Sequence, residues 1–243
     1  MTRLDAVAIG AHPDDVELAC GGTLALLARR GRRVGIVHLT RGERGTRGTV
    51  EARRREAERA AEALGAAALE ILDCGDGGLR TGPAEEEALI AVLRRWRPEL
   101  VFGPPPGDRH PDHGRAHALV DAACFYAGLA ARGDGDPHRP AAVFHYMQHD
   151  PFPPAFIVDV TAGWAAKEAA LACYETQLYQ RDHPQAAPAE PATKVASREF
   201  ALAVEGRARH YGLLIGAELG EPFAARLPLA VRDPLAVLPG GLR

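Results

Sequence analysis

Two short stretches of the sequence hold side chains whose types and spacing could do chemistry. AHPDD (residues 11–15) comes directly after an apolar run, and HPDH (residues 110–113) comes a few residues after another. Together they offer His12, Asp14, Asp15, His110, Asp112 and His113. Polar groups that lose solvation near a buried strand need partners. Because AHPDD supplies several acceptors and no obvious donor, we expect a cation to provide the missing charge.

The ligand types match a catalytic metal site. Two imidazoles and one carboxylate, with one position left open for water, form a common zinc arrangement, and the metal lowers the pKa of that water to about 7. His12, Asp15 and His113 can supply this set. Asp14 then remains beside the metal as a second carboxylate that can take a proton from the water as general base.

The HPDH motif adds a group that could act as an acid. A protonated His110 ring would face the oxyanion that develops during hydrolysis. Asp112 or a backbone carbonyl could orient that ring. The two motifs together therefore favour metal-assisted hydrolysis.

Simpler interpretations exist for each motif taken alone. Asp14 and Asp15 could form an Asx-type turn that caps the following helix, and Asp112 could be the N-cap of a helix over 113–127. His117, one helical turn beyond the HPDH motif, competes as a metal ligand, although such a residue is more often a plain histidine on a helix face. The joint placement of the motifs favours the metal site.

The elements that must position these motifs alternate along the chain. β-rich runs alternate with helical patterns through the first half, which is the signature of βαβ units and a parallel sheet. We expect strands over 5–10, 33–39, 68–73 and 99–103, and helices over 16–30, 50–64, 84–97 and 113–127. In the common strand order 3-2-1-4, ligands bind beyond the carboxyl ends of the first and fourth strands. The motifs would then share one crevice of an α/β, Rossmann-like, doubly wound and mainly parallel sheet with helices on both faces.

The pattern changes after residue 130. There we expect strands over 141–147 and 155–160, helices over 161–179 and 199–216, and an irregular tail. Residues 180–193 are rich in proline and alanine and predict a long surface loop that could be a mobile flap. We expect a single domain over 1–243, with a core over 1–130 and a smaller α/β extension over 131–243.

Composition excludes several classes of function. The 243 residues are 47% hydrophobic with a formal net charge of -3, which argues against nucleic-acid and anionic-membrane surfaces. No stretch of about eighteen apolar residues and no signal-peptide pattern occurs, so we expect a cytoplasmic protein. The turn after the first strand lacks the G-x-G-x-x-G spacing of a dinucleotide site, and Ser197 is the only serine, with no G-x-S-x-G elbow.

At these residues the sequence resembles the LmbE-like (PIG-L) family of zinc-dependent N-acetylglucosaminide deacetylases. AHPDD together with HPDH is specific for that family. Further segments resemble its bacillithiol-biosynthesis branch: AHPDDVELACGGTLALLARRG, LTRGERGTRGT, EARRREAERAAEALG, DRHPDH, YMQHDPFPPAFIVDV and RARHYGLLIGAELGEPF. The resemblance implies hydrolysis of the acetamide of N-acetylglucosaminyl malate to glucosaminyl malate and acetate.

Carried over to matching positions, the resemblance implies one Zn²⁺ per chain, or another divalent metal, held by His12, Asp15 and His113. It implies that Asp14 is the general base. Members of this branch are often oligomeric, so we expect a homo-oligomer, a trimer or hexamer.

The resemblance also assigns the surrounding residues. His110 resembles the residue that stabilises the oxyanion or acts as general acid, with Asp112 as its orienting partner. Arg53 matches the family arginine that contacts the substrate carboxylate or sugar.

Two other functions remain open at this point. One keeps the metal and changes the substrate to a mycothiol precursor or another N-acetylated amino sugar. The other is a metal-binding or regulatory module without catalysis. Asp14 argues against the second, because a structural zinc site needs no spare carboxylate beside it.

Overall fold

The computed structural model describes residues 3–180 and 193–233. Most of the loop expected over 180–193 therefore lies outside the described residues. The strands are β1 (Ala6–Gly10), β2 (Val34–His38), β3 (Ala68–Ile71), β4 (Leu100–Gly103), β5 (Ala142–Tyr146), β6 (Phe156–Asp159) and β7 (Gly220–Ala225). The helices are α1 (Asp15–Arg29), α2 (Val50–Ala63), α3 (Pro83–Trp96), α4 (Pro111–Tyr126), the 3-10 turn η1 (Thr161–Gly163), α5 (Trp164–Ala172) and α6 (Arg198–Leu214).

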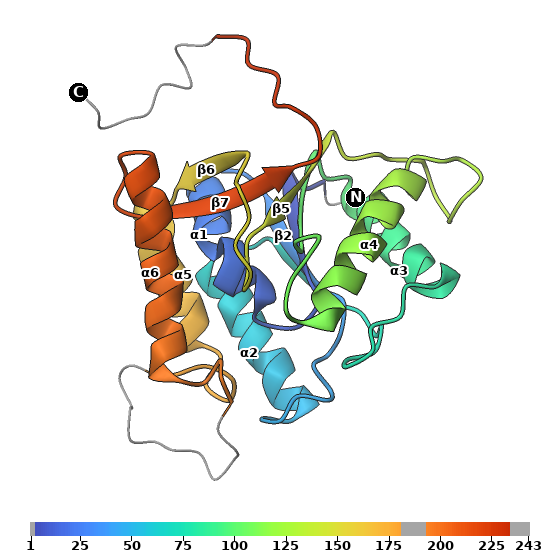
Figure 1. Cartoon of the computed structure of the whole chain (residues 1–243). Coiled ribbons are helices and arrows are strands. Elements are labelled where there is room, and N and C mark those ends of the chain that lie inside the picture. Colours follow the sequence, from blue (N-terminus) through green and yellow to red (C-terminus); the bar gives the residue numbers. More distant parts are fainter. Residues whose placement is uncertain (1–2, 181–192, 234–243) are drawn as a thin grey trace.

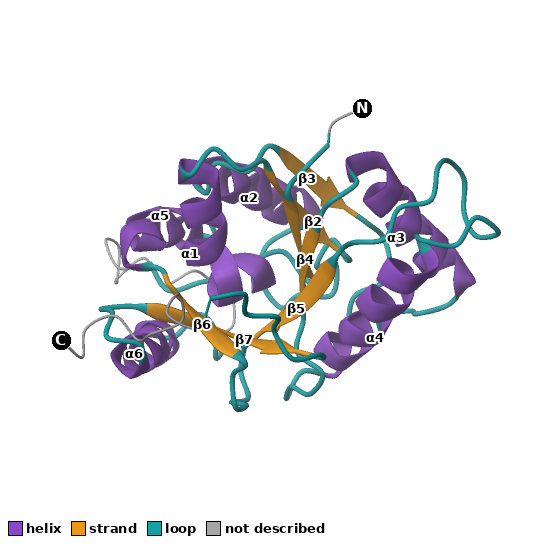
Figure 2. Ribbon diagram, turned by 90° about the horizontal axis from the view of Figure 1, so that it is seen from above, coloured by secondary structure: helices purple, strands orange, loops and turns teal. Residues whose placement is uncertain are grey.

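One mixed sheet organises the chain, with strand order β3-β2-β1-β4-β5-β7-β6. The first five strands in that order are parallel, and β7 pairs antiparallel with both β5 and β6. The predicted α/β class and the order 3-2-1-4 are confirmed. The strands after residue 130 extend the same sheet, which Figures 1 and 2 show as a continuous twisted layer.

Helices cover both faces of this sheet because successive strand residues point to opposite sides. Ala6 and Ala8 of β1 belong to a core cluster under α1 and α2, while Val7 and Ile9 belong to a second cluster under α3 and α4. Helix α5 packs on α1 and α2, and α6 packs on β7. In Figure 2, α3 and α4 lie on one side of the strands and α1, α2 and α5 on the other.

Two expectations for the second half were wrong. The tail was expected to be irregular, yet Gly220–Ala225 forms β7, which pairs with β5 on one side and β6 on the other. A proline such as Pro222 normally disfavours a strand inside a sheet, and here the pairing with two distant strands outweighs that preference. The helix expected over 161–179 begins as η1 and ends at Ala172. Beyond it the chain packs on α2, where the backbone N–H and hydroxyl of Thr176 both donate to Glu56 at 2.8 Å.

Candidate active site

The first motif follows β1 and turns sharply into α1. Asp14 is the N-cap residue of α1, with a left-handed backbone (φ 108°) and no side-chain capping hydrogen bond. The Asp15 carboxylate instead accepts from the backbone N–H of His12 at 2.8 Å. A non-glycine residue held in such a conformation costs about 1–3 kcal/mol and is typical of functional sites. Asp14 therefore holds the N-cap position without using its side chain as a cap, and the Asp15 carboxylate is directed towards His12.

β1 and β4 are adjacent and parallel, so the two motifs meet as expected. The Asp15 carboxylate lies between two imidazoles: one oxygen is 3.3 Å from His12 Nδ1 and the other is 3.3 Å from His113 Nε2. Ordinary hydrogen bonds of this type are shorter, whereas two ligands each about 2.1 Å from one tetrahedral ion lie about 3.4 Å apart. The Gln148 amide also donates to Asp15.

A second carboxylate stands behind each imidazole. Asp108 lies 3.0 Å from His113 Nδ1. His12 Nε2 is buried 3.2 Å from Asp76 and 3.4 Å from Asp112, without a well-aligned hydrogen bond to either. Metal-ligating histidines almost always present their second ring nitrogen to such a partner. This arrangement leaves His12 Nδ1 and His113 Nε2 facing Asp15.

The site is strongly polarised. Burial alone would lower the pKa of His113, but Asp15 and Asp108 raise it to about 9. Burial would raise the pKa of Asp15, yet His113 and His12 hold it well below its ordinary value.

Several ligand groups overlap around these two rings. Those found among the described residues are His12 with His110 and His113, Asp108 with His113 and His149, and His12 with Asp76 and Asp112. We favour His12, Asp15 and His113 because each ring then keeps an outer carboxylate. The Asp112 carboxylate already accepts hydrogen bonds from several other donors.

His110 is the N-cap of α4, which begins at Pro111, so the expected helix over 113–127 starts two residues earlier and Asp112 is not its cap. His110 Nδ1 accepts from the backbone N–H of Asp112 at 3.2 Å. A neutral ring therefore carries its hydrogen on Nε2, which makes that atom a donor rather than a metal ligand. Burial, with His12 and His113 nearby, lowers the pKa of His110.

The link between Asp112 and His110 thus runs through the Asp112 backbone and not through its carboxylate. That carboxylate accepts from the backbone N–H groups of residues 77–79 at 2.8–3.3 Å and from Arg115 at 3.0 Å. Asp112 therefore fixes the loop after β3 against the site.

Asp14 is buried beside Arg53, with 3.7 Å between its carboxylate and the guanidinium. Burial raises the pKa of Asp14 to about 7, and the charge of Arg53 partly opposes that rise. A carboxylate with a pKa near the working pH suits a general base.

Arg53 is only 4% exposed. It donates to the backbone carbonyls of Gly42 at 3.0 Å and Pro13 at 2.9 Å. Gly42 has φ +64°, and a Cβ there would overlap the guanidinium. The structure therefore places Arg53 beside Asp14, with two of its three guanidinium nitrogens donating to backbone carbonyls.

Four residues at this edge of the sheet were not predicted from the sequence: Asp76, Asp108, Gln148 and His149. Each follows the carboxyl end of a strand, namely β3, β4 or β5. His149 stacks on His113 with ring centroids 5.6 Å apart and donates its backbone N–H to Asp108 at 2.9 Å. The placement of YMQHD at the end of a predicted strand was a usable signal.

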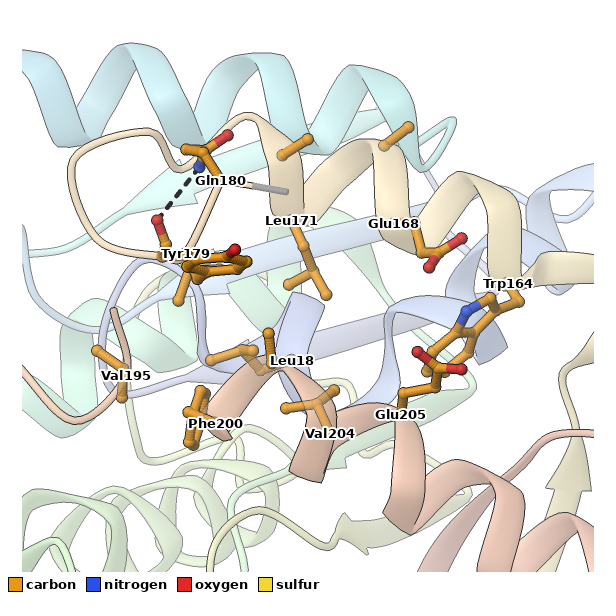
Figure 3. Close-up of a pocket in the computed structure, with 14 residues that line it drawn as sticks. Leu18, Trp164, Glu168, Leu171, Tyr179, Gln180, Val195, Phe200, Val204 and Glu205 are labelled. Atoms are coloured by element: carbon orange, nitrogen blue, oxygen red, sulfur yellow. Dashed lines mark hydrogen bonds between the residues drawn. The ribbon is translucent and has the colours of Figure 1, made fainter. Parts of the chain in front are cut away.

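A cavity of about 610 Å³ opens next to His149. Its lining includes three cationic side chains, Arg109, Lys194 and Arg207, which outnumber two carboxylates, Asp150 and Glu199. A different pocket, between α5 and α6, is shown in Figure 3; it is lined mainly by apolar side chains such as Leu171 and Phe200 and contains no imidazole. The cationic cavity is therefore the one that continues the candidate site.

Comparisons with known proteins agree with this geometry. Residues 7–124 match the PIG-L family, described as GlcNAc-PI de-N-acetylase. A diacetylchitobiose deacetylase from Thermococcus kodakarensis is 34% identical over 183 residues, covering 69% of this chain and 67% of that protein. A 4-oxalmesaconate hydratase from Pseudomonas putida is 32% identical over 190 residues, covering 71% and 73%.

The fold also matches a solved structure along nearly its whole length. The conserved protein TT1542 from Thermus thermophilus superposes with a TM-score of 0.85 and 37% identity, covering 95% of this chain and 98% of that one. Within residues 3–180 and 193–233, none of the helices is long and apolar enough to cross a membrane. Matched by its sequence, its relatives and its fold, the chain belongs to the PIG-L family of de-N-acetylases.

Proposed function

We propose that this chain is a metal-dependent N-deacetylase of an amino sugar, and that its substrate is N-acetylglucosaminyl malate. The products are glucosaminyl malate and acetate. The observation that carries the proposal is the position of Asp15 between His12 and His113, with the buried Asp14 beside them. This arrangement supports a cation site with a proton acceptor next to it at the same strand ends.

The donor set fits zinc, one ion per chain, although another divalent metal has compatible chemistry. Two imidazole nitrogens and one carboxylate oxygen leave one coordination position open. Bound there, the metal would act as a Lewis acid on the acetamide and lower the pKa of water.

The remaining steps belong to the chain's own residues. Asp14 takes the proton from the attacking water, and its pKa of about 7 makes it available at neutral pH. Arg53, beside Asp14, holds it in place. His110 donates a hydrogen bond from its Nε2 to the oxyanion. When the C–N bond breaks and acetate is released, Asp14 gives the leaving amine the proton that it took from the water, which restores its carboxylate. Asp112 positions His110 through its backbone N–H.

The cationic cavity supports a carboxylate-bearing aglycone such as malate. Three cationic side chains line the space next to His149, against two carboxylates: Arg109, Lys194 and Arg207, with Asp150 and Glu199. Charge-assisted contacts between such groups and a carboxylate are shorter and stronger than neutral ones. We place the malate carboxylates here rather than on Arg53, because that guanidinium is buried and donates to two backbone carbonyls.

Acetate release from a panel of substrates tests the proposal. The panel contains N-acetylglucosaminyl malate, an N-acetylglucosaminide without a carboxylate, and diacetylchitobiose. We expect Arg109→Ala to lower kcat/KM for the malate compound by about tenfold or more and to spare the uncharged glycoside. Arg54→Ala, on an exposed arginine paired with Glu58, is the matched control.

Two results would overturn this assignment. Equal kcat/KM for the charged and uncharged glycosides would remove malate as the substrate. Absence of acetate release, together with water addition to an unsaturated dicarboxylate, would favour a hydratase, the activity named for the Pseudomonas putida relative.

We also propose that the chain forms a homo-oligomer, a trimer or hexamer, by its resemblance to the bacillithiol branch. Sedimentation equilibrium on the purified protein measures this directly, and a monomer at all concentrations would refute it.

A further inference from the structure

A second cluster of metal-ligating side chains lies further along α4 than His113, where that helix meets β5. His117 and Asp121 are one and two turns beyond His113 on that helix, and His145 is on β5. The three residues offer one ligand atom each within 4.8 Å of one another. The proposed reaction uses none of them.

The two imidazoles share their partners. Their ring centroids are 4.3 Å apart, and their Nδ1 atoms are separated by 3.2 Å. Both Nδ1 atoms lie near the carbonyl oxygen of Pro104, at 2.8 Å for His145 and 3.2 Å for His117. On the opposite side, Asp121 lies 3.5 Å from His145 Nε2 and 3.9 Å from His117 Nε2.

The position of the ring hydrogen of His145 determines what its Nε2 presents to Asp121. A carbonyl oxygen can only accept, so the 2.8 Å contact with Pro104 places the ring hydrogen on Nδ1. In a neutral ring, Nε2 then presents a lone pair to the Asp121 carboxylate. A fully protonated ring would instead draw the carboxylate to about 2.7–2.9 Å. The observed 3.5 Å is longer than such a charge-assisted hydrogen bond, and in a neutral ring it would set a lone pair against the carboxylate.

A cation between these atoms resolves the mismatch. Two ligands each about 2.1 Å from one tetrahedral ion lie about 3.4 Å apart, close to the distance between His145 Nε2 and Asp121. The hydrogen bond from Nδ1 to a backbone carbonyl is also the usual second contact of a metal-bound imidazole.

We propose that His117, His145 and Asp121 form a second binding site for a divalent transition metal, separate from the candidate active site. Two imidazoles and a carboxylate suit zinc and its neighbours in the first transition series rather than calcium or magnesium. His145 and Asp121 also line a groove of about 600 Å³, which gives an ion a path to the site and leaves room for water as a further ligand. The ion would tie α4, which carries His113, to the sheet at β5.

Metal stoichiometry tests the proposal without relying on activity. The purified, untagged chain is dialysed to equilibrium against micromolar Zn²⁺, and bound metal is measured by elemental analysis. We expect about two ions per chain in the wild type. His145→Ala and Asp121→Asn should each bind about one ion fewer, and His113→Ala should lose the other ion while retaining this one.

His138→Ala is the matched control. His138 Nε2 also lies 2.7 Å from a proline carbonyl, that of Pro98, but it belongs to none of the ligand groups found among the described residues. This variant should bind as much metal as the wild type. Circular dichroism confirms that each variant is folded, and the mild Asp121→Asn substitution keeps the test decisive if His145→Ala is not. Unchanged metal content in a folded Asp121→Asn variant would overturn the second site.

Discussion

Replacing Asp14 by asparagine separates proton transfer from folding at this site. The backbone at Asp14 is left-handed, with φ 108°, a conformation that most residues disfavour and that asparagine tolerates best after glycine. The amide has nearly the same size and shape as the carboxylate but cannot accept the water's proton at neutral pH. Asp14→Asn should therefore leave the fold intact and remove the base.

The expected loss follows from the environment of Asp14. Burial raises its pKa to about 7, so a proton can move onto and off this carboxylate near neutral pH. General-base catalysis typically contributes about 10²- to 10⁴-fold. The predicted fall in kcat is of that size, which corresponds to about 3–5 kcal/mol in the activation free energy.

The assay is acetate release at saturating substrate, with bound metal measured on the same sample. Asp136→Asn, on an exposed loop, controls for loss of a carboxylate elsewhere. Because the proposed ligands His12, Asp15 and His113 are untouched, metal content should equal that of the wild type. A kcat within tenfold of the wild-type value would remove Asp14 from the mechanism, and a loss of metal would make it a ligand.

Four further substitutions probe the surrounding contacts. His113→Ala should lose the active-site ion, and full occupancy in elemental analysis would refute the ligand assignment. Asp108→Asn should weaken metal affinity by about 10- to 100-fold in a chelator competition, because the Asp108 carboxylate contacts His113 Nδ1 and orients that ring. Arg53→Lys should lower kcat/KM by similar factors on charged and uncharged substrates, since lysine cannot reproduce the fork; a loss confined to charged substrates would place Arg53 on the substrate. Gly42→Ala should destabilise the fold by at least about 1–3 kcal/mol in denaturant unfolding, whereas Gly107→Ala, with open space around it, should change little.

The first half of the fold was predictable because its signals are local. Apolar runs such as residues 33–39 and 99–103 alternate with amphipathic stretches, and the βαβ rule fixes how such units join. The second half depends on distant partners. β7 forms because β5 and β6 supply hydrogen-bond partners on both sides, and the sequence around Pro222 contains no pattern that predicts this pairing.

The candidate site divides in the same way. His12, Asp15 and His113 stand in short motifs, and adjacent parallel strands bring them together, so their convergence followed from topology alone. The contacts of Arg53, in contrast, could not be predicted from topology. Its direction depends on the carbonyls of Gly42 and Pro13, and spacing along a helix cannot reveal whether a guanidinium meets backbone or solvent.

The charge of a bound cation would explain why so many carboxylates are close together at this edge of the sheet. Four carboxylates lie within 3.4 Å of the two imidazoles: Asp15, Asp76, Asp108 and Asp112. Protons on both rings would offset only part of that charge, and they would sit on the ring nitrogens that face Asp15. A divalent ion would supply the same two charges at one point, between those nitrogens and the Asp15 carboxylate, and would leave an outer carboxylate facing the second nitrogen of each ring. The outer acids therefore orient the rings and raise their basicity, and the ion that the rings hold would balance the acids in turn.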